Sequence, residues 1–127
     1  MTAQRVLIIN RNGMIMRELK TAAITEAVEE LVKDANFYLP DDVVPAIKEA
    51  KKREVSSTGK GIFDMILENI DYSAQEKMPL CQDTGFAVFF LELGQDLHIS
   101  GGDFNEAINE GVRRGYKDGF LRKSIVD

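Results

Sequence analysis

The chain has 127 residues, of which 44% are hydrophobic and 29% charged, and its formal net charge is -5 at pH 7. These values are typical of one soluble globular domain, and the acidic balance excludes nucleic acid and anionic membrane as main partners. No apolar run approaches the roughly 20 residues of a membrane span, and the single cysteine excludes an internal disulfide and predicts a cytoplasmic location.

Residues 1–13 differ from the sequence that follows them. Arg5 and Arg11 flank a short apolar run at residues 6–9, and the segment lacks the long apolar region and cleavage site of a secretory signal. Met14 offers a second possible start directly afterwards. We interpret residues 1–13 as an added leader or the product of an upstream start, with a short edge strand as the alternative. Residues 14–127 are then the region of interest.

Three helices are expected before the cysteine. The first begins at Lys20 or Thr21, of which Thr21 is the better cap, and it ends before Pro40. Apolar residues at helical spacing give it one stripe, formed by Ile24, Val28, Leu31, Val32 and Ala35.

The second and third predicted helices follow closely. Asp41 or Asp42 caps the second helix, which runs to about Lys52. Residues 56–61 then form a polar linker and a cap. The third helix presents an apolar face that we assign to the core, with Ile62, Phe63, Ile66, Leu67 and Ile70.

The segment after the cysteine predicts two strands. Residues 86–93 are nearly all apolar, as in a strand that is buried on both faces. A turn at residues 94–96 and the alternating residues 97–100 predict a second strand that pairs with the first. His98 is expected on the less buried side of that second strand, without a catalytic role.

A last helix completes the predicted fold. Asp103 and Glu106 have the spacing of a capping box, and Gly119 is a natural helix end. Gly111 and Gly115 each cost about 1 kcal/mol relative to alanine inside a helix, so another backbone is expected close to them. The predicted fold class is therefore α+β: N-terminal helices, then a short β hairpin or small sheet, and a C-terminal helix.

The stretch between the third helix and the apolar run carries the most chemistry. Pro79 and Gly85 predict an irregular loop, in which Cys81, Gln82 and Asp83 follow one another. A thiolate can bind a soft metal or an iron–sulfur cluster, and a carboxylate two residues on can take or give a proton beside it. The alternative is that Cys81 is a small buried hydrophobic residue.

Three stretches of the sequence resemble the class I fumarases and, equally, the α subunit of L(+)-tartrate dehydratase. They occur in the family's order and spacing, and the resemblance covers about residues 14–127. The stretches are Pro79-Leu80-Cys81-Gln82-Asp83-Thr84-Gly85, then Gly102-Asp103-Phe104-Asn105-Glu106-Ala107-Ile108-Asn109-Glu110-Gly111-Val112-Arg113-Arg114-Gly115-Tyr116, then Leu121-Arg122-Lys123-Ser124.

The resemblance implies a hydro-lyase that interconverts fumarate and malate or dehydrates tartrate, and it does not separate these dicarboxylates. It implies that Cys81 is one of three cysteine ligands of a four-iron (4Fe-4S) cluster, whose open iron acts as a Lewis acid. It places Gln82 and Asp83 at the substrate, with Asp83 as a catalytic residue. It also places Arg122 on a substrate carboxylate, for which a planar guanidinium is suited.

The resemblance further implies a β subunit or β domain as partner, in a homo-oligomer of αβ units. One thiolate cannot hold a four-iron cluster, and the family's remaining cluster cysteines lie in parts that these 127 residues do not include. We therefore expect a truncated part of the α catalytic region, inactive and without the cluster when alone. The alternative is a stand-alone, non-catalytic interaction domain that keeps the family scaffold.

Overall fold

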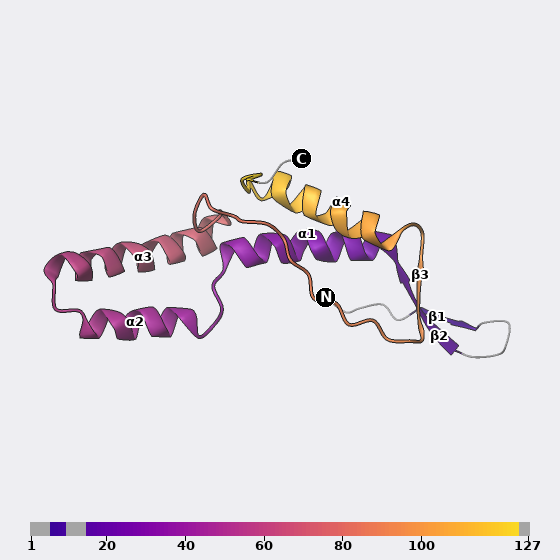
Figure 1. Cartoon of the computed structure of the whole chain (residues 1–127), viewed down its shortest axis with the longest axis horizontal. Helices are drawn as coiled ribbons and strands as arrows, with labels where there is room; N and C mark the ends of the chain where they lie inside the picture. Colours follow the sequence, from indigo (N-terminus) through magenta and orange to yellow (C-terminus); the bar gives the residue numbers. More distant parts are fainter. Residues whose placement is uncertain (1–5, 10–14, 125–127) are drawn as a thin grey trace.

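The computed structural model describes residues 6–9 and 15–124. These residues form an elongated α+β fold of helices and one small sheet, as predicted (Figure 1). In the described ranges no helix is both long and apolar enough to cross a membrane. The elements in chain order are β1 (Val6–Ile9), β2 (Ile15–Lys20), α1 (Thr21–Phe37), α2 (Val43–Arg53), α3 (Ser57–Glu76), β3 (Leu97–Ser100) and α4 (Phe104–Asp118).

Helices α1 and α4 lie side by side and form the body of the molecule (Figure 1). Their backbones approach closely because Gly111 and Gly115 have no side chain. A Cβ atom on Gly111 would lie 2.6 Å from Val28 Cβ and 2.7 Å from the carbonyl oxygen of Thr25. The glycines were predicted to mark a close backbone, and this prediction is confirmed. The buried core around the crossing consists of Ile24, Val28, Val32, Phe37, Ala107, Tyr116 and Leu121.

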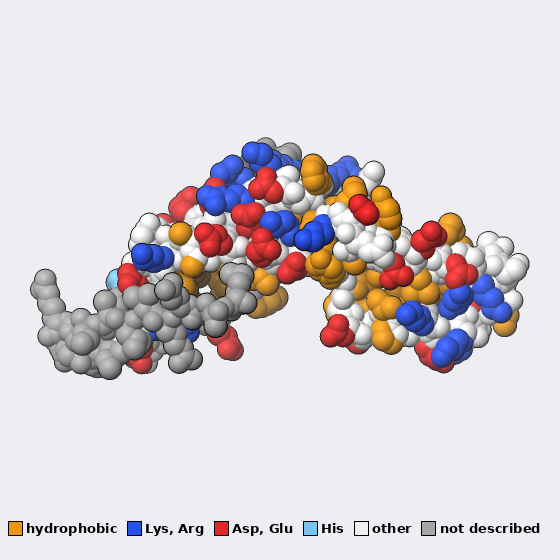
Figure 2. Space-filling view, turned by 180° about the vertical axis from the view of Figure 1, so that it is seen from behind, with side chains coloured by type: hydrophobic (Ala, Val, Ile, Leu, Met, Phe, Trp, Pro, Cys, Tyr) orange, Lys and Arg blue, Asp and Glu red, His pale blue; other side chains and the backbone are white. Residues whose placement is uncertain are grey.

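Helices α2 and α3 form an arm that projects away from this body (Figure 1). Lys51 of α2 is paired with Asp64 of α3, and apolar side chains lie between the two helices. The prediction that the α3 stripe belongs to the core is wrong. Ile62 and Ile66 are exposed, and the half-buried Phe63, Leu67 and Ile70 do not belong to the core cluster. The reason is that α3 packs on α2 alone along most of its length, so one side of its apolar face stays open. Figure 2 shows hydrophobic side chains along the arm and at its junction with the body.

Ser73 connects the α2–α3 arm to the body through hydrogen bonds. It is 1% exposed, and its Oγ lies 3.1 Å from the carbonyl oxygen of Phe37 and 2.5 Å from that of Met78. Phe37 ends α1, whereas Met78 lies two residues after the end of α3. A buried hydroxyl between two carbonyl groups satisfies its own hydrogen-bonding need and joins these two helix ends.

The sheet has the order β1-β2-β3, and its connections differ from those predicted. Strand β3 does not form a hairpin with residues 86–93. It pairs instead with β2, in parallel, with Glu18 opposite His98. Strand β2, which sequence reasoning missed, also pairs with β1 antiparallel. Strand β1 is the edge strand given as the alternative for residues 1–13, and the division of the chain at residue 13 stays a prediction.

Residues 86–93 do not form the predicted strand. They run as an extended segment across α1, and none of them belongs to a sheet in the described part of the chain (Figure 1). Phe89 packs against the core, while Phe86, Val88 and Phe90 are exposed. The prediction of a strand buried on both faces is therefore wrong, because β3 is paired with β2 and no described strand lies beside this segment.

The ends of α1, α2 and α4 agree with the predictions, whereas α3 begins at Ser57, so residues 57–61 are helical and not a linker. Asp42 occupies the predicted cap position of α2, but its side chain makes no capping hydrogen bond. Asp103 accepts a hydrogen bond from the Glu106 amide at 3.0 Å, and Ser56 caps α3 in the same way. At α1, however, Lys20 holds the cap position and Thr21 is the first helical residue. Thr21 lies instead beside Gly101, whose added Cβ would meet the threonine hydroxyl at 3.1 Å.

The glycine contact predicts the effect of a single methyl group. Gly111→Ala should destabilise the fold by about 1–2 kcal/mol, because overpacking against Val28 outweighs the gain in helix propensity. Gly61→Ala is the matched control, since nothing lies within 4 Å of an added Cβ in α3. It should leave stability equal or raise it by up to about 1 kcal/mol. Urea unfolding followed by circular dichroism measures both. Equal stabilities for the two variants would contradict the close crossing.

Candidate functional site

The loop that carries Cys81 is fixed at its entrance by α1 and α3. The Leu80 amide donates a hydrogen bond to the carbonyl oxygen of Asn36 at 3.0 Å. The Leu80 carbonyl oxygen accepts one from Asn69 Nδ2 at 2.8 Å. Both backbone groups of the residue before Cys81 therefore have partners on different helices, which sets the direction in which the chain enters the loop.

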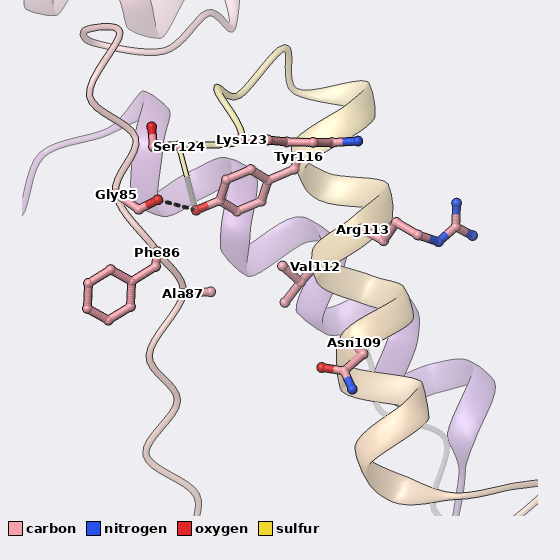
Figure 3. A pocket seen from close by; sticks show the side chains of 9 residues that line it. All are labelled: Gly85, Phe86, Ala87, Asn109, Val112, Arg113, Tyr116, Lys123 and Ser124. Atoms are coloured by element: carbon pink, nitrogen blue, oxygen red, sulfur yellow. Dashed lines mark hydrogen bonds between the residues drawn. The ribbon is translucent and has the colours of Figure 1, made fainter. Parts of the chain in front are cut away.

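The exit of the loop is fixed by α4 and by the segment that follows it. Thr84 Oγ1 donates to the carbonyl oxygen of Arg122 at 2.8 Å. The Tyr116 hydroxyl lies 3.2 Å from the carbonyl oxygen of Thr84 and 3.3 Å from that of Gly85 (Figure 3). Partial burial raises the pKa of Tyr116, so the phenol stays protonated and able to donate over a wide pH range.

The chemical groups lie between these two anchors and are open to solvent. Cys81, Gln82 and Asp83 are all exposed, and Cys81 Sγ lies 3.6 Å from the carbonyl oxygen of Asp83. The alternative that Cys81 is a buried hydrophobic residue is therefore wrong. The loop presents a thiol, an amide and a carboxylate in sequence, on a backbone held from both sides.

Arg122 lies next to this loop because of the Thr84 hydrogen bond. Its side chain is exposed and makes no ion pair with any residue that the structure describes. Two other arginines, in α4, are paired. The Glu110 carboxylate accepts a hydrogen bond from Arg113 Nε at 2.8 Å and one from Arg114 Nε at 2.6 Å. These bonds lower the pKa of the Glu110 carboxyl, with Arg113 as the larger cause. Arg122 is thus an unpaired arginine among the described residues beside the loop, and the exposed Lys123 next to it makes no ion pair in the described part of the chain either.

A pocket of about 440 Å³ lies beside the loop, between α4 and the extended segment (Figure 3). It includes Gly85 and Tyr116 but none of Cys81, Gln82, Asp83 or Arg122. Arg113 and Lys123 give it two basic groups. The candidate site is therefore the open loop surface, and the pocket is its neighbour.

Sequence reasoning missed the two residues that hold the loop, Thr84 and Tyr116. The sequence could have indicated Tyr116, because it lies four residues after Val112 and so continues the apolar stripe of α4. Thr84 had none, since its partner is a backbone carbonyl far away in the sequence.

The described residues supply one possible ligand for an iron–sulfur cluster. Cys81 is the only cysteine, and no group of three or more Cys, His, Asp or Glu side chains able to hold a metal ion occurs within residues 6–9 and 15–124. A cluster with three cysteine ligands does not fit this chain alone. The exposure of Cys81 fits a thiolate that acts as one ligand among several.

The fold and the loop define an α+β chain with an exposed thiol, amide and carboxylate in one loop, which is hydrogen-bonded to the backbone of Arg122. The family model described as fumarate hydratase (Fumerase) matches residues 25–127. The chain belongs to this family of hydro-lyases, as its sequence resemblance predicted.

Curated relatives cover most of the chain but extend well beyond it. A putative L(+)-tartrate dehydratase subunit alpha from Methanocaldococcus jannaschii is 38% identical over 104 residues, which is 81% of this chain and 36% of the relative. The L(+)-tartrate dehydratase subunits alpha of Escherichia coli and Shigella sonnei are 30% identical over 104 residues, which is 82% of this chain and 34% of each relative. The chain thus spans about a third of the length of the relatives it matches.

The burial of Tyr116 predicts that the stability of the fold depends on pH in the alkaline range. The pKa of Tyr116 is higher in the folded chain than in the unfolded one, so the folded state holds the phenolic proton more tightly. This contribution to stability is fully present below a pH of about 10 and is lost as pH rises through the folded pKa. In an alkaline titration at 295 nm, Tyr116→Phe should remove the tyrosine step at highest pH. The exposed Tyr72 is the control, and Tyr72→Phe should leave that step in place. Loss of the step in both variants, or in neither, would contradict the assignment.

Proposed function

We propose that the chain is part of a hydro-lyase that adds water to, or removes it from, a small dicarboxylate: fumarate and malate, or tartrate. One observation carries this proposal. The Thr84–Arg122 hydrogen bond of 2.8 Å joins the loop of Cys81 and Asp83 to the backbone of Arg122, whose exposed side chain makes no ion pair with a described residue. Membership in the family supports the reaction class.

Each of the four side chains has a role that suits its chemistry. Cys81 contributes one thiolate ligand to a four-iron cluster, and the other ligands come from polypeptide outside these 127 residues. Arg122 binds one carboxylate of the substrate through two parallel N–H groups. Gln82 donates and accepts hydrogen bonds at the substrate. Asp83 handles a proton at the carbon next to a carboxylate.

Charge supports these assignments. A dicarboxylate brings two negative charges, and removal of a proton next to a carboxylate adds more negative charge to the same group. A fixed cation at that position stabilises the transition state more than the ground state. Arg122 is unpaired in the described part of the chain, so its charge is not already neutralised by the protein. Arg113 and Arg114 fit this role less well because both donate hydrogen bonds to the Glu110 carboxylate.

The proposal includes partners and a compartment. We infer a β subunit or β domain, because the curated relatives are named as α subunits of dehydratases. We further infer that αβ units assemble into a homo-oligomer. An exposed thiol that must stay reduced favours the cytoplasm.

The single cysteine gives a test on the chain alone. Anaerobic incubation of the 127-residue chain with iron and sulfide should yield no stoichiometric four-iron cluster and no broad visible absorbance after desalting, because one thiolate leaves the other irons without ligands. Iron and sulfide content, measured on a confirmed monomer, shows whether the chain alone holds a cluster. A full cluster in the monomer would contradict the assignment of the other ligands to additional polypeptide.

The site itself is tested in the assembly completed by the remaining α region and the β partner. Cys81→Ser should abolish cluster retention and turnover together, because a hydroxyl replaces a soft thiolate poorly. Arg122→Lys should keep the cluster and lower kcat/KM by about 100-fold, or roughly 2–4 kcal/mol, since a point charge replaces a planar fork. Asp83→Asn should keep the cluster and lose turnover.

Matched substitutions on the arm serve as controls. Arg53→Lys in α2 and Asp71→Asn in α3 make the same chemical changes at exposed positions away from the loop. Both should retain the cluster and full hydration of fumarate or dehydration of tartrate. Full activity of Asp83→Asn and Arg122→Lys would show that the roles are assigned wrongly. A completed assembly that binds its β partner but never holds iron would favour the non-catalytic interaction domain.

A further inference from the structure

Residues 86–93 run as an extended segment that lacks the backbone hydrogen bonds of a strand (Figure 1). The segment is extended, and no backbone hydrogen bond joins any of its residues to another described residue. Backbone N–H and C=O groups are strong donors and acceptors. An extended run that leaves them unpaired is a template on which another strand can pair.

Most side chains of the segment are open to solvent. Phe86, Val88 and Phe90 are 69%, 61% and 95% exposed, and Leu91 and Leu93 are 52% and 54% exposed. Phe89 packs against the core, and Figure 3 shows Ala87 turned toward α4. The segment therefore touches the body at few points and leaves most of its apolar surface uncovered.

The exposed face is strongly apolar, and a hollow lies beside it. A groove of about 600 Å³ runs between the segment and α1, lined on the α1 side by Leu31 and Ala35. Leu31 is itself exposed although it belongs to the apolar stripe of α1. Aromatic and β-branched residues are those that strands favour, and contiguous apolar surface on a soluble protein marks an interaction site.

We propose that residues 86–93 become a paired β-strand when an apolar strand of additional polypeptide docks along them. The occupant is a strand from the region of the relatives that has no counterpart in these 127 residues, since the chain covers only 36% and 34% of their length. Its chemistry is that of β-augmentation: main-chain hydrogen bonds along the segment, and apolar side chains placed over Phe86, Val88 and Phe90. This inference rests on family membership and is independent of the proposed reaction.

The position of the segment connects this docking with the loop. Residue 86 directly follows Gly85, whose carbonyl oxygen is within reach of the Tyr116 hydroxyl. A strand that pairs along residues 86–93 therefore arrives beside the exit of the Cys81 loop. The same polypeptide that completes the sheet is thereby placed where it can bring further groups to the loop.

A fused chain tests the pairing. The 127 residues are joined to the uncovered remainder of the Methanocaldococcus jannaschii relative, and amide hydrogen exchange is compared with that of the chain alone. Amides at alternate positions in residues 86–93 should exchange about 100-fold more slowly in the fusion, because a strand paired along one edge protects every second N–H. Protection of all amides equally would indicate simple burial and would overturn the pairing.

Two substitutions of exposed phenylalanines complete the test. Phe90→Asp should abolish the protection in the fusion, because a carboxylate would have to be buried under the docked strand. Phe120→Asp changes a phenylalanine that is 79% exposed and lies outside the segment, and it should leave the protection unchanged. Unprotected amides in the fusion would overturn the proposal. So would protection in the chain alone that rises with protein concentration, which would assign the segment to a second copy. Because the readout is exchange and not turnover, failure here is distinct from failure of the proposed reaction.

Discussion

The close crossing of α1 and α4 is the constraint on which the rest of the structure depends. Gly111 and Gly115 let the α4 backbone lie against Val28, Glu29 and Val32 of α1. The crossing is also hydrogen-bonded, because the buried Thr25 hydroxyl donates to the carbonyl oxygen of Ala107 at 3.0 Å. Glycine costs helix stability, and the packing it permits offsets that cost. Since Tyr116 follows Gly115 directly, the crossing also decides where the hydroxyl that holds the loop is placed.

The loop of Cys81 is held almost entirely through backbone groups. Its anchors are the Leu80 amide and carbonyl at the entrance and the carbonyl oxygens of Thr84 and Gly85 at the exit. The side chains of Cys81 and Asp83 make no ion pair or side-chain bond to the described residues that would hold the loop. They are therefore available for a ligand. Preorganisation by the backbone, with reactive side chains left unoccupied, suits a site that becomes complete only when more groups arrive.

Two surfaces of the chain remain apolar and open: the α2–α3 arm and residues 86–93. They share a physical cause. Each carries apolar side chains that the described residues cover only in part. Burial of apolar surface contributes roughly 25 cal/mol per Å², so both surfaces favour association with further polypeptide. The chain spans about a third of its relatives, and these surfaces lie where such association would begin.

The sequence by itself determined the features that depend on neighbours a few residues away. It predicted the α1 helix, the Asp103 cap of α4 and the family to which the chain belongs. The tertiary structure alone decided the pairings between distant segments. It joined β3 to β2, with Ser100 hydrogen-bonded to Glu18 at 2.5 Å across 82 positions, and so left residues 86–93 without a partner. It likewise bonded Thr84 to Arg122. The reason is that helix periodicity and caps are local, whereas a strand or a hydroxyl can accept any partner that the packing of the helices brings within reach.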